Sequence, residues 1–315
     1  MRLYRIEIEP LSPWRTPWQS DTLAGLLCWT CARHFGSETL RRTILDPAGE
    51  GTPPFVTSDA FPGEWLPLPA SLRLLDWPAQ QRKTLSRARW ISSDTFRRVQ
   101  EGKRPAVEEC VSNAGLVRHV QSRNSIGRSS NTTAGGGSLF AADELLLAGS
   151  ITRLGLYVRL ATGFEQTFLD LMALLAQSGF GADVSVGRGQ FQIASSLDPI
   201  DSFDDVTQPD GFVVLSTFQP ECRDPSDGCW ETFTKYGKLG PDFGLQNVFK
   251  RPLVLFRPGA CFRTSSPPPL VVGTTIPMDE LLPSDAVLQL RNLGAEVCHY
   301  AFGLCVPFPI GAFHP

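Results

Sequence analysis

Residues 154–194, LGLYVRLATGFEQTFLDLMALLAQSGFGADVSVGRGQFQIA, contain in order the patterns of a strand, a helix, a glycine-rich loop and a second strand. Apolar residues alternate along 154–160, which predicts the first strand. They then recur at helical spacing, which predicts a helix over 163–177 that ends where the loop 179–189 begins. The loop leads into a strand over 190–194.

The N-terminal part of the chain supplies the first half of the same fold. A strand is expected over 3–8, a helix from Ser20 or Asp21 to Gly36, and a further strand near 54–57. The resulting order, β-α-β-β-α-β, predicts an α+β fold of the ferredoxin-like (RRM) type. In that arrangement an antiparallel sheet carries two helices on one face and leaves the other face free for a ligand.

The length of the chain favours two domains. It has 315 residues, of which 42% are hydrophobic and 19% charged, which is enough apolar material for a packed core. We assign residues 1–197 to the first domain, with an insertion at about 81–150, and residues 207–315 to a second, smaller α+β domain. The acidic stretch 198–210 is interpreted as a linker.

Charge is distributed unevenly along the chain. The formal net charge is −3, which argues against a protein that binds nucleic acid over its whole surface. Residues 81–128, however, contain eleven basic and four acidic residues, so this segment has a net charge of +7 and the remainder −10. A polyanion site is therefore expected to be local.

The N-terminus and the cysteines indicate in which cellular compartment the protein is expected. The first ten residues, MRLYRIEIEP, alternate apolar and polar residues, unlike a signal peptide, and no segment reaches the roughly 18 apolar residues of a membrane helix. Eight cysteines are too few for a disulfide scaffold in a chain of this length and are expected to be free thiols. We expect a cytoplasmic protein without membrane contact.

The basic segment offers the first candidate contacts with RNA. Its long side chains could neutralise phosphates, and its polar ones could hold unstacked bases. The candidates, which precede the low-complexity stretch 129–138, are Arg118, His119, Arg123, Asn124 and Arg128. A charged surface that contacts only solvent is the alternative.

The loop 179–189 offers the second set. Gly179, Gly181, Gly187 and Gly189 permit positive φ angles and close approach of the backbone to a polyanion, and Ser185 and Arg188 suit phosphate oxygens. The glycines follow a helix and precede a strand, which is the reverse of a Rossmann fingerprint. A glycine-rich hairpin without a ligand is the alternative.

Neither a metal nor a cofactor is expected. Cys28, Cys31 and His34 have ligand chemistry but lie within one predicted helix, without a second cysteine pair at zinc-ribbon spacing, which favours buried thiols. The chain contains neither a nucleophile elbow nor an HExxH pair. His119, in its basic surroundings, is the one candidate acid or base for RNA cleavage.

Four blocks together resemble a known family. They are Ser20–Trp29 (SDTLAGLLCW), Ser58–Pro62 (SDAFP) with Leu66–Pro69 (LPLP), Arg123–Arg128 (RNSIGR) and Gly179–Phe191 (GFGADVSVGRGQF). In this order they are similar to the RAMP subunit numbered four of the Csm effector complex in type III-A CRISPR systems. The blocks span residues 20–191, and the C-terminal part adds a general likeness.

The resemblance implies tandem ferredoxin-like (RAMP) modules, the first with a long basic insertion, and a non-catalytic function. This family binds the 5′ handle of the CRISPR RNA (crRNA) and bridges the large signature subunit to the backbone RAMP subunits, so it meets target RNA only indirectly. Carried over by position, the loop 179–189 and the block Arg123–Arg128, including Ser125, would contact the handle. Ser20, Asp21 and Thr22 would begin the helix that faces the RNA, and the insertion would supply a thumb-like hairpin that kinks the guide.

Other interpretations stay open. An endoribonuclease that processes guide RNA on the same fold would use His119 as its acid or base. A protein–protein adaptor would bind no RNA through its glycine loop. An equivalent RAMP subunit of another type III subtype would share the fold and the mode of binding.

Overall fold

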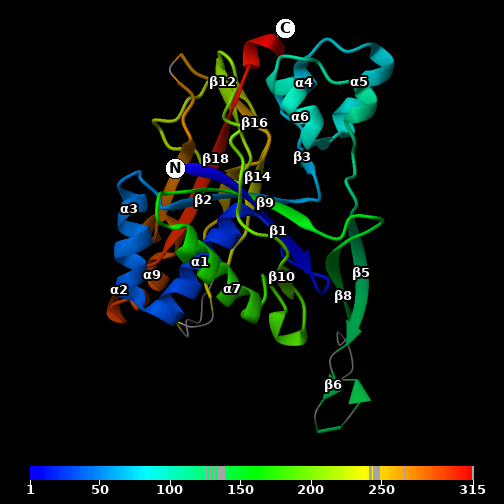
Figure 1. Cartoon of the computed structure of the whole chain (residues 1–315). Helices are drawn as coiled ribbons and strands as arrows, with labels where there is room; N and C mark the ends of the chain where they lie inside the picture. Colours follow the sequence, from blue (N-terminus) through cyan, green and yellow to red (C-terminus); the bar gives the residue numbers. More distant parts are fainter. Residues whose placement is uncertain are drawn as a thin grey trace.

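The computed structural model describes residues 1–124, 126–127, 129–130, 132–133, 139–240, 243, 249–265 and 267–313. Two five-stranded sheets form its centre, with a group of helices at one end and a projecting hairpin (Figure 1). The α+β class expected from the sequence is confirmed. Within the described residues, no helix is both long enough and apolar enough to cross a membrane.

The first sheet is antiparallel and has the predicted connectivity. Its strands are β1 (Arg2–Pro10), β2 (Phe55–Pro62), β9 (Leu154–Leu160) and β10 (Phe191–Ile193), in the order β10-β1-β9-β2, and the short β11 (Asp198–Pro199) also pairs with β1. Helix α1 (Ser20–Phe35) leads through α2 (Ser37–Leu40), the π-helical turn η1 (Arg41–Leu45) and α3 (Asp46–Gly49) to β2. Helix α7 (Glu165–Ser178) joins β9 to β10, so the order β-α-β-β-α-β is present.

The two long helices form where the apolar periodicity predicts them. In α7 the buried side chains are Phe168, Leu171, Met172 and Leu175, which follow the helical repeat. Each helix ends at a glycine with a φ of 87°, Gly36 after α1 and Gly179 after α7. A side chain rarely adopts this conformation, so glycine stops each helix.

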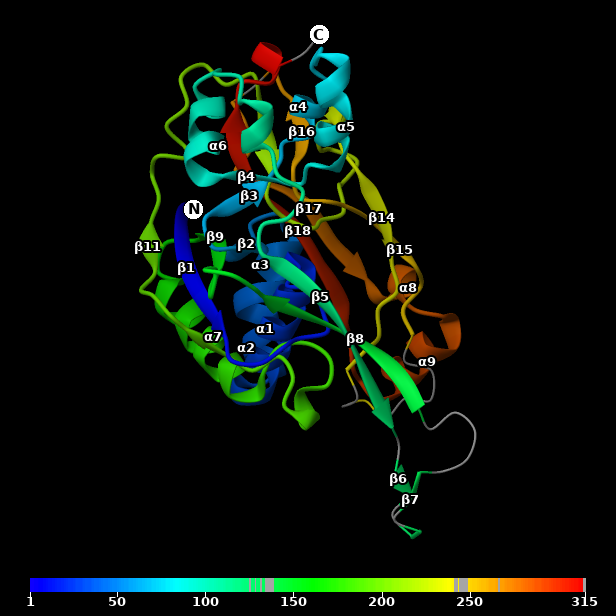
Figure 2. The same ribbon diagram turned by 90° about the vertical axis from the view of Figure 1, so that its right-hand side faces the viewer.

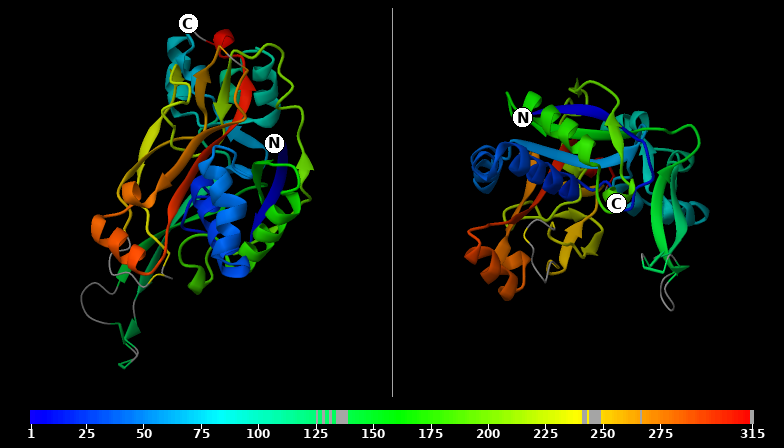
Figure 3. Two further views of the ribbon diagram at one scale, coloured as in Figure 1. Left: turned by 90° about the vertical axis from the view of Figure 1, so that its left-hand side faces the viewer. Right: turned by 90° about the horizontal axis from the view of Figure 1, so that it is seen from below.

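The chain between β2 and β9 forms two bodies rather than one insertion. The first, which we call the helical lobe (residues 65–109), contains β3 (Trp65–Pro67), α4 (Ser71–Leu74), α5 (Ala79–Arg87), β4 (Trp90–Ser92), α6 (Ser93–Gln100) and η2 (Val107–Glu109). The second is a long hairpin of β5 (Leu116–Asn124) and β8 (Leu139–Leu147), with short strands β6 (Ile126–Gly127) and β7 (Thr132–Thr133) beyond it. The hairpin projects from the body in every view (Figures 2 and 3).

The second sheet has a different connectivity from the first. Its strands are β12 (Gly211–Val214), β13 (Gly228–Cys229), β16 (Ala260–Arg263), β17 (Val271–Pro277) and β18 (Cys298–Phe308), in the order β13-β16-β12-β18-β17. A two-stranded ribbon, β14 (Thr232–Lys235) with β15 (Leu253–Phe256), lies between β13 and β16 in the chain. Helices α8 (Met278–Leu281) and α9 (Ser284–Asn292) precede β18, and a 3₁₀ turn, η5 (Ile310–Phe313), follows it. The tandem arrangement of ferredoxin-like modules therefore stays a prediction.

One buried cluster spans both sheets. Tyr300 of β18 stacks on Phe55 of β2, with 5.2 Å between ring centroids, and its hydroxyl donates to the Phe55 carbonyl at 2.6 Å. The core residues of β2, β9, α1 and α7, and most of those of β18, belong to this single cluster. The two sheets are thus packed as one body, and the division into residues 1–197 and 207–315 stays a prediction.

The face of the first sheet opposite α1 and α7 is closed. Tyr157 and Phe61, which point to this face, are buried. Phe203 stacks on Tyr157 at 5.5 Å between centroids, and Trp90 of the helical lobe meets Phe61 edge to face at 6.0 Å. The expectation that this face is free for a ligand is wrong, because the lobe and the segment after β11 pack against it.

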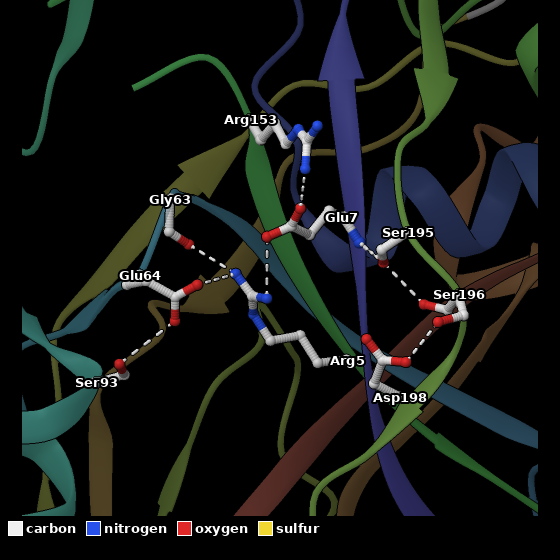
Figure 4. A network of polar contacts seen from close by, with 9 residues as sticks. All are labelled: Arg5, Glu7, Gly63, Glu64, Ser93, Arg153, Ser195, Ser196 and Asp198. Carbon is white, nitrogen blue, oxygen red and sulfur yellow. Dashed lines mark hydrogen bonds and ion pairs between the residues drawn. The ribbon is translucent and has the colours of Figure 1, made fainter. Parts of the chain in front are cut away.

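The more exposed corner of the same face carries a balanced polar network (Figure 4). Arg5 donates to Glu7 at 3.1 Å and to Glu64 at 2.5 Å, and Arg153 donates to the other Glu7 oxygen at 2.7 Å. Burial raises the pKa of Glu7, but the contacts with Arg153 and Arg5 outweigh it, so the net shift is downward. Two arginines face two glutamates here, so the corner offers a polyanion no excess positive charge.

Candidate nucleic-acid interface

The base of the projecting hairpin meets two loops that are distant in the sequence. Trp14, in the loop between β1 and α1, exchanges backbone hydrogen bonds of 3.0 and 2.7 Å with Leu145 of β8. In the same region, the Gly189 N–H donates to the Pro13 carbonyl at 3.0 Å. The hairpin, the β1–α1 loop and the glycine loop therefore form one assembled surface.

Glu144 on β8 lies at the centre of this junction. Its side chain is only 2% exposed, and one carboxylate oxygen accepts from Arg123 of β5 at 2.5 Å and from Arg188 of the glycine loop at 2.8 Å. Burial raises the pKa of Glu144, but the hydrogen bonds from Arg188 and Arg123 lower it by more. Arg188 also donates to the side chain of Gln121 at 2.8 Å.

Asp183 extends the same network. Its carboxylate accepts from Arg15 at 2.9 Å and from Arg123 at 2.6 Å. The hydrogen bond from Arg15 is the main cause of the lowered pKa of Asp183, and burial opposes it. Asp183 has a φ of 64°, in the left-handed region that a short polar side chain tolerates.

The structure thus brings together Arg123 and Arg188, two of the arginines expected to contact RNA. Both are half-buried, and both already donate to carboxylates. Their visible role is to hold the hairpin onto the glycine loop. A direct contact with the crRNA handle stays a prediction for both side chains.

Three of the four loop glycines are explained by protein packing. A Cβ at Gly189 would lie 2.0 Å from the Phe180 carbonyl oxygen, one at Gly181 2.6 Å from the Cβ of Thr16, and one at Gly179 2.8 Å from the side-chain nitrogen of Gln190. Gly187 alone in this loop has nothing within 4 Å of such an atom. Close backbone approach to a ligand is therefore open at Gly187, next to the exposed Ser185 in the turn η3 (Val184–Val186).

The two kinds of loop glycine can be separated by mutation. Gly189 and Gly187 have φ angles of 69° and 79°, so alanine at either site carries a backbone cost of about 1–2 kcal/mol. Only Gly189→Ala adds a clash with backbone, and we expect a total loss of about 3 kcal/mol or more in unfolding free energy. Denaturant unfolding of the two variants measures the difference, and equal losses would contradict the packing argument.

The start of α1 does not face outward as expected. Ser20 and Asp21 are each 2% exposed. The Ser20 hydroxyl donates to the Thr217 carbonyl at 2.7 Å, and Lys235 donates to both oxygens of Asp21 and to the Thr22 hydroxyl, each at 2.7 Å. These residues join α1 to the segment after β12 and to the β14–β15 ribbon.

Asp21 and its neighbours form a buried ionic cluster. His299 Nε2 lies 3.1 Å from Asp21, and His299 Nδ1 lies 3.2 Å from the Lys250 amine. Burial raises the pKa of Asp21, but His299 and Lys235 lower it by more, to about 2. Burial lowers the pKa of both His299 and Lys250. Asp59, also buried, accepts from the Ser20 and Thr217 backbones, and burial raises its pKa to about 6.

The remaining hairpin candidates lie on its exposed surface. Arg118 donates to both oxygens of Asp143 at 3.0 and 2.6 Å, and the pair is exposed. His119 and Asn124 are exposed on β5. Ser125 and Arg128, and most of the low-complexity stretch 129–138, lie outside the described residues.

The positive charge of the segment 81–128 is divided between the two bodies of the insertion. Eight of its eleven basic residues belong to the helical lobe and two, Arg118 and Arg123, to the hairpin, while Arg128 lies outside the described residues. Lys83 and Arg87 on α5 and Arg97 on α6 are exposed, and no ion pair joins them to another described residue. On the hairpin, Arg118 and Arg123 both face carboxylates. Among the described basic residues of this segment, those without an ion-pair partner thus lie on the lobe and not beside the glycine loop.

The residues with metal-ligand chemistry on α1 do not converge. Burial raises the pKa of Cys28 and Cys31, while His34 is exposed. Within the part of the chain that the structure describes, no three side chains of His, Cys, Asp or Glu are grouped to hold a metal ion.

A cleft of about 500 Å³ was missed by sequence reasoning. It opens between the hairpin base, the helical lobe and the second sheet, and its wall includes Trp14, Trp18 and Trp90, three of the seven tryptophans of the chain. The tryptophan pair in the proline-rich stretch 10–18 was the sequence signal that could have pointed to it. Only the fold shows that Trp90 joins them.

We compared the sequence with known families and curated proteins, and the structure with solved structures. No family model and no curated protein matches the sequence. Among solved structures, a Csm1–Csm4 cassette in complex with pppApA matches with a TM-score of 0.62 and 16% identity, over 97% of this chain and 98% of that one. The Csm3–Csm4 subcomplex of the type III-A CRISPR-Cas interference complex matches with a TM-score of 0.60 and 11% identity, over 98% and 99%. Both assemblies contain Csm4.

The chain shares its fold with chains of these two Csm4-containing assemblies. At 11% and 16% identity, it is the fold that is shared. The likeness extends over the second sheet, which the sequence blocks at 20–191 did not reach. The match covers 97% and 98% of this chain.

Proposed function

We propose that this chain is a non-catalytic, RNA-binding subunit of a type III-A CRISPR (Csm) effector complex in antiviral defence. In this proposal it binds the 5′ handle of the crRNA and bridges the large signature subunit to the backbone RAMP subunits. The observation that carries it is the Csm4-like fold over almost the whole chain.

The hairpin supports the proposal. Its base is fixed by the Glu144 and Asp183 networks, so the arm is held in one direction relative to the body. Its outer part exposes Val120, Leu139 and Phe140, at 58%, 71% and 48%. Exposed apolar side chains on a projecting element are typical of an interaction surface, for unstacked bases or for a neighbouring subunit.

The site favours binding over catalysis. His119 is exposed, and its ring makes no hydrogen bond or ion pair with another described residue. A general base is normally oriented by a third group, as in a triad. We therefore propose a binding role for His119 and keep cleavage as an outcome of the test.

The proposed function predicts a defined RNA in the assembled complex. The chain is co-expressed with its neighbouring Csm-type subunits and a CRISPR array from the same genome, and copurified RNA is sequenced. We expect small RNAs with one common 5′ sequence, released progressively as salt rises because phosphate contacts dominate affinity. Random fragments would contradict the proposal, and an assembly without RNA would favour the adaptor interpretation.

Cleavage is tested separately. Labelled repeat RNA is incubated with the wild-type chain and with His119→Ala in the presence of a chelator. We expect no cut by either protein. A metal-independent cut that disappears in His119→Ala would replace the binding role by that of an endoribonuclease.

A further inference from the structure

The cleft at the base of the hairpin has the chemistry of a ligand site. Its volume of about 500 Å³ lies within the range of small-molecule sites, about 300–1,000 Å³. Parts of the chain that are distant in the sequence line it, among them the β1–α1 loop, the end of β2, the helical lobe, the base of the hairpin and the turn before β16. A close contact seals one side, because a Cβ at Gly259 would lie 2.7 Å from the Leu68 carbonyl oxygen.

Aromatic side chains form much of the wall. Trp14, Trp18, Phe61 and Trp90 all line the cleft. Trp18 stacks on Phe180 of the glycine loop, with 3.8 Å between ring centroids and 7° between ring planes. The Trp18 indole N–H is buried and has no hydrogen-bond partner among the described residues, although a buried tryptophan usually has one.

Arginines lie at the other side of the cleft. Arg73, Arg89 and Arg257 line it, together with Glu231, which is the ion-pair partner of Arg73. Arg89 donates to the Ser86 and Ala88 carbonyls, and Arg257 lies 4.6 Å from the centroid of the Phe233 ring. Neither is ion-paired with another described residue. The wall also contains the carboxylate of Asp59, which accepts hydrogen bonds from the backbones of Ser20 and Thr217.

We propose that this cleft binds a single nucleotide, with its base against the tryptophan wall and its phosphate at Arg89 and Arg257. Aromatic wall residues together with two guanidinium groups that have no ion-pair partner among the described residues match a base and a phosphate. The nucleotide could come from two sources. The first is an unstacked nucleotide of a bound RNA, and in this form the inference rests on the proposed RNA-binding function. A free nucleoside monophosphate has the same chemistry and is the second source.

Charge-removing variants test the phosphate half. The full chain is titrated with each of the four nucleoside 5′-monophosphates by calorimetry. We expect saturable binding that weakens about tenfold or more in Arg89→Gln/Arg257→Gln, the effect of losing charge-assisted hydrogen bonds. Arg87→Gln is the matched control: it removes a charge two residues away, on α5 and outside the cleft, and should leave affinity within about twofold.

Photocrosslinking tests the base half in the assembled complex. Synthetic guide RNAs carry 4-thiouridine at one position each, and crosslinked peptides are identified by mass spectrometry. We expect one position to crosslink to the peptides that contain Trp18 or Trp90, and the yield to fall in Arg89→Gln/Arg257→Gln but not in Arg87→Gln.

The outcomes separate this inference from the proposed function. RNA retained by the complex, without crosslinks in these peptides and without monophosphate binding, would overturn the nucleotide site and leave the proposed function standing. If RNA is not retained, the proposed function fails, and the monophosphate titration decides the cleft: arginine-dependent binding supports a free-nucleotide site, and no binding overturns it.

Discussion

Arg159→Ala is expected to lower the free energy of unfolding by about 3–5 kcal/mol, the typical cost of breaking a buried ion pair. Arg159 on β9 is completely buried. Its guanidinium forms two hydrogen bonds with Asp204, one of them at 2.8 Å, and donates to the Cys305 carbonyl on β18 at 3.1 and 2.8 Å. The substitution leaves a cavity and a buried carbonyl without its donor, at the contact between the two sheets.

An exposed arginine provides the control for this experiment. Arg2 pairs with Asp201 at 2.8 Å, but the two side chains are 53% and 74% exposed. Arg2→Ala is therefore expected to change stability by less than about 1 kcal/mol. Urea unfolding of both variants gives the comparison. Similar losses in the two would show that Arg159 does not clamp the sheets.

Asp21→Asn is expected to have the second-largest effect, a loss of about 3 kcal/mol at pH 7. The substitution leaves the amine of Lys235 without its carboxylate partner in a largely buried site. Asp279→Asn is the matched control, because the Asp279–Arg291 pair is exposed, and it should cost less than about 1 kcal/mol. Denaturant unfolding at pH 7 measures both.

Asp21 and Asp59 predict opposite pH dependences. The pKa of Asp21 is lowered to about 2, so its contribution to stability, about 2 kcal/mol, is present above about pH 4 and is lost as pH falls through the folded-state pKa. The pKa of Asp59 is raised to about 6, so the native state takes up the extra proton and stability falls as pH rises from about 4 to about 6. Asp59→Asn should remove the fall in stability between about pH 4 and about pH 6, and Asp21→Asn should remove the loss of stability below about pH 4. A wild-type-like pH profile in either variant would contradict this assignment.

The local elements of the first sheet could be predicted because each depends on short-range pattern. The buried residues of α7 recur at helical spacing, and Gly179 ends the helix because it needs a positive φ. The alternating apolar residues of 154–160 form β9 with the predicted bounds. These signals lie within about one element of sequence, so no knowledge of the partner strands was needed.

The candidate site was harder to predict, because whether a side chain is free to contact a ligand depends on partners that are distant in the sequence. Arg123 meets Glu144 at a separation of 21 residues, and Arg15 meets Asp183 at a separation of 168. The basic segment, the glycine loop and the family resemblance predicted Arg123 and Arg188 as RNA contacts, whereas the structure places a shared carboxylate between them. Likewise, protein atoms occupy the space beside three of the loop glycines at which the sequence suggested close approach of a ligand.

By itself, the sequence determined the order of strands and helices in the first half, the glycine helix stops and the presence of a local excess of positive charge. The tertiary structure decided where that charge is available: mainly on the helical lobe, whose Arg89 lies with Arg257 beside a cleft that no single segment encodes. The physical reason is the sequence distance over which the two kinds of interaction act. Backbone periodicity is set by neighbours along the chain, whereas burial and charge compensation are set by whatever the fold brings within a few ångströms.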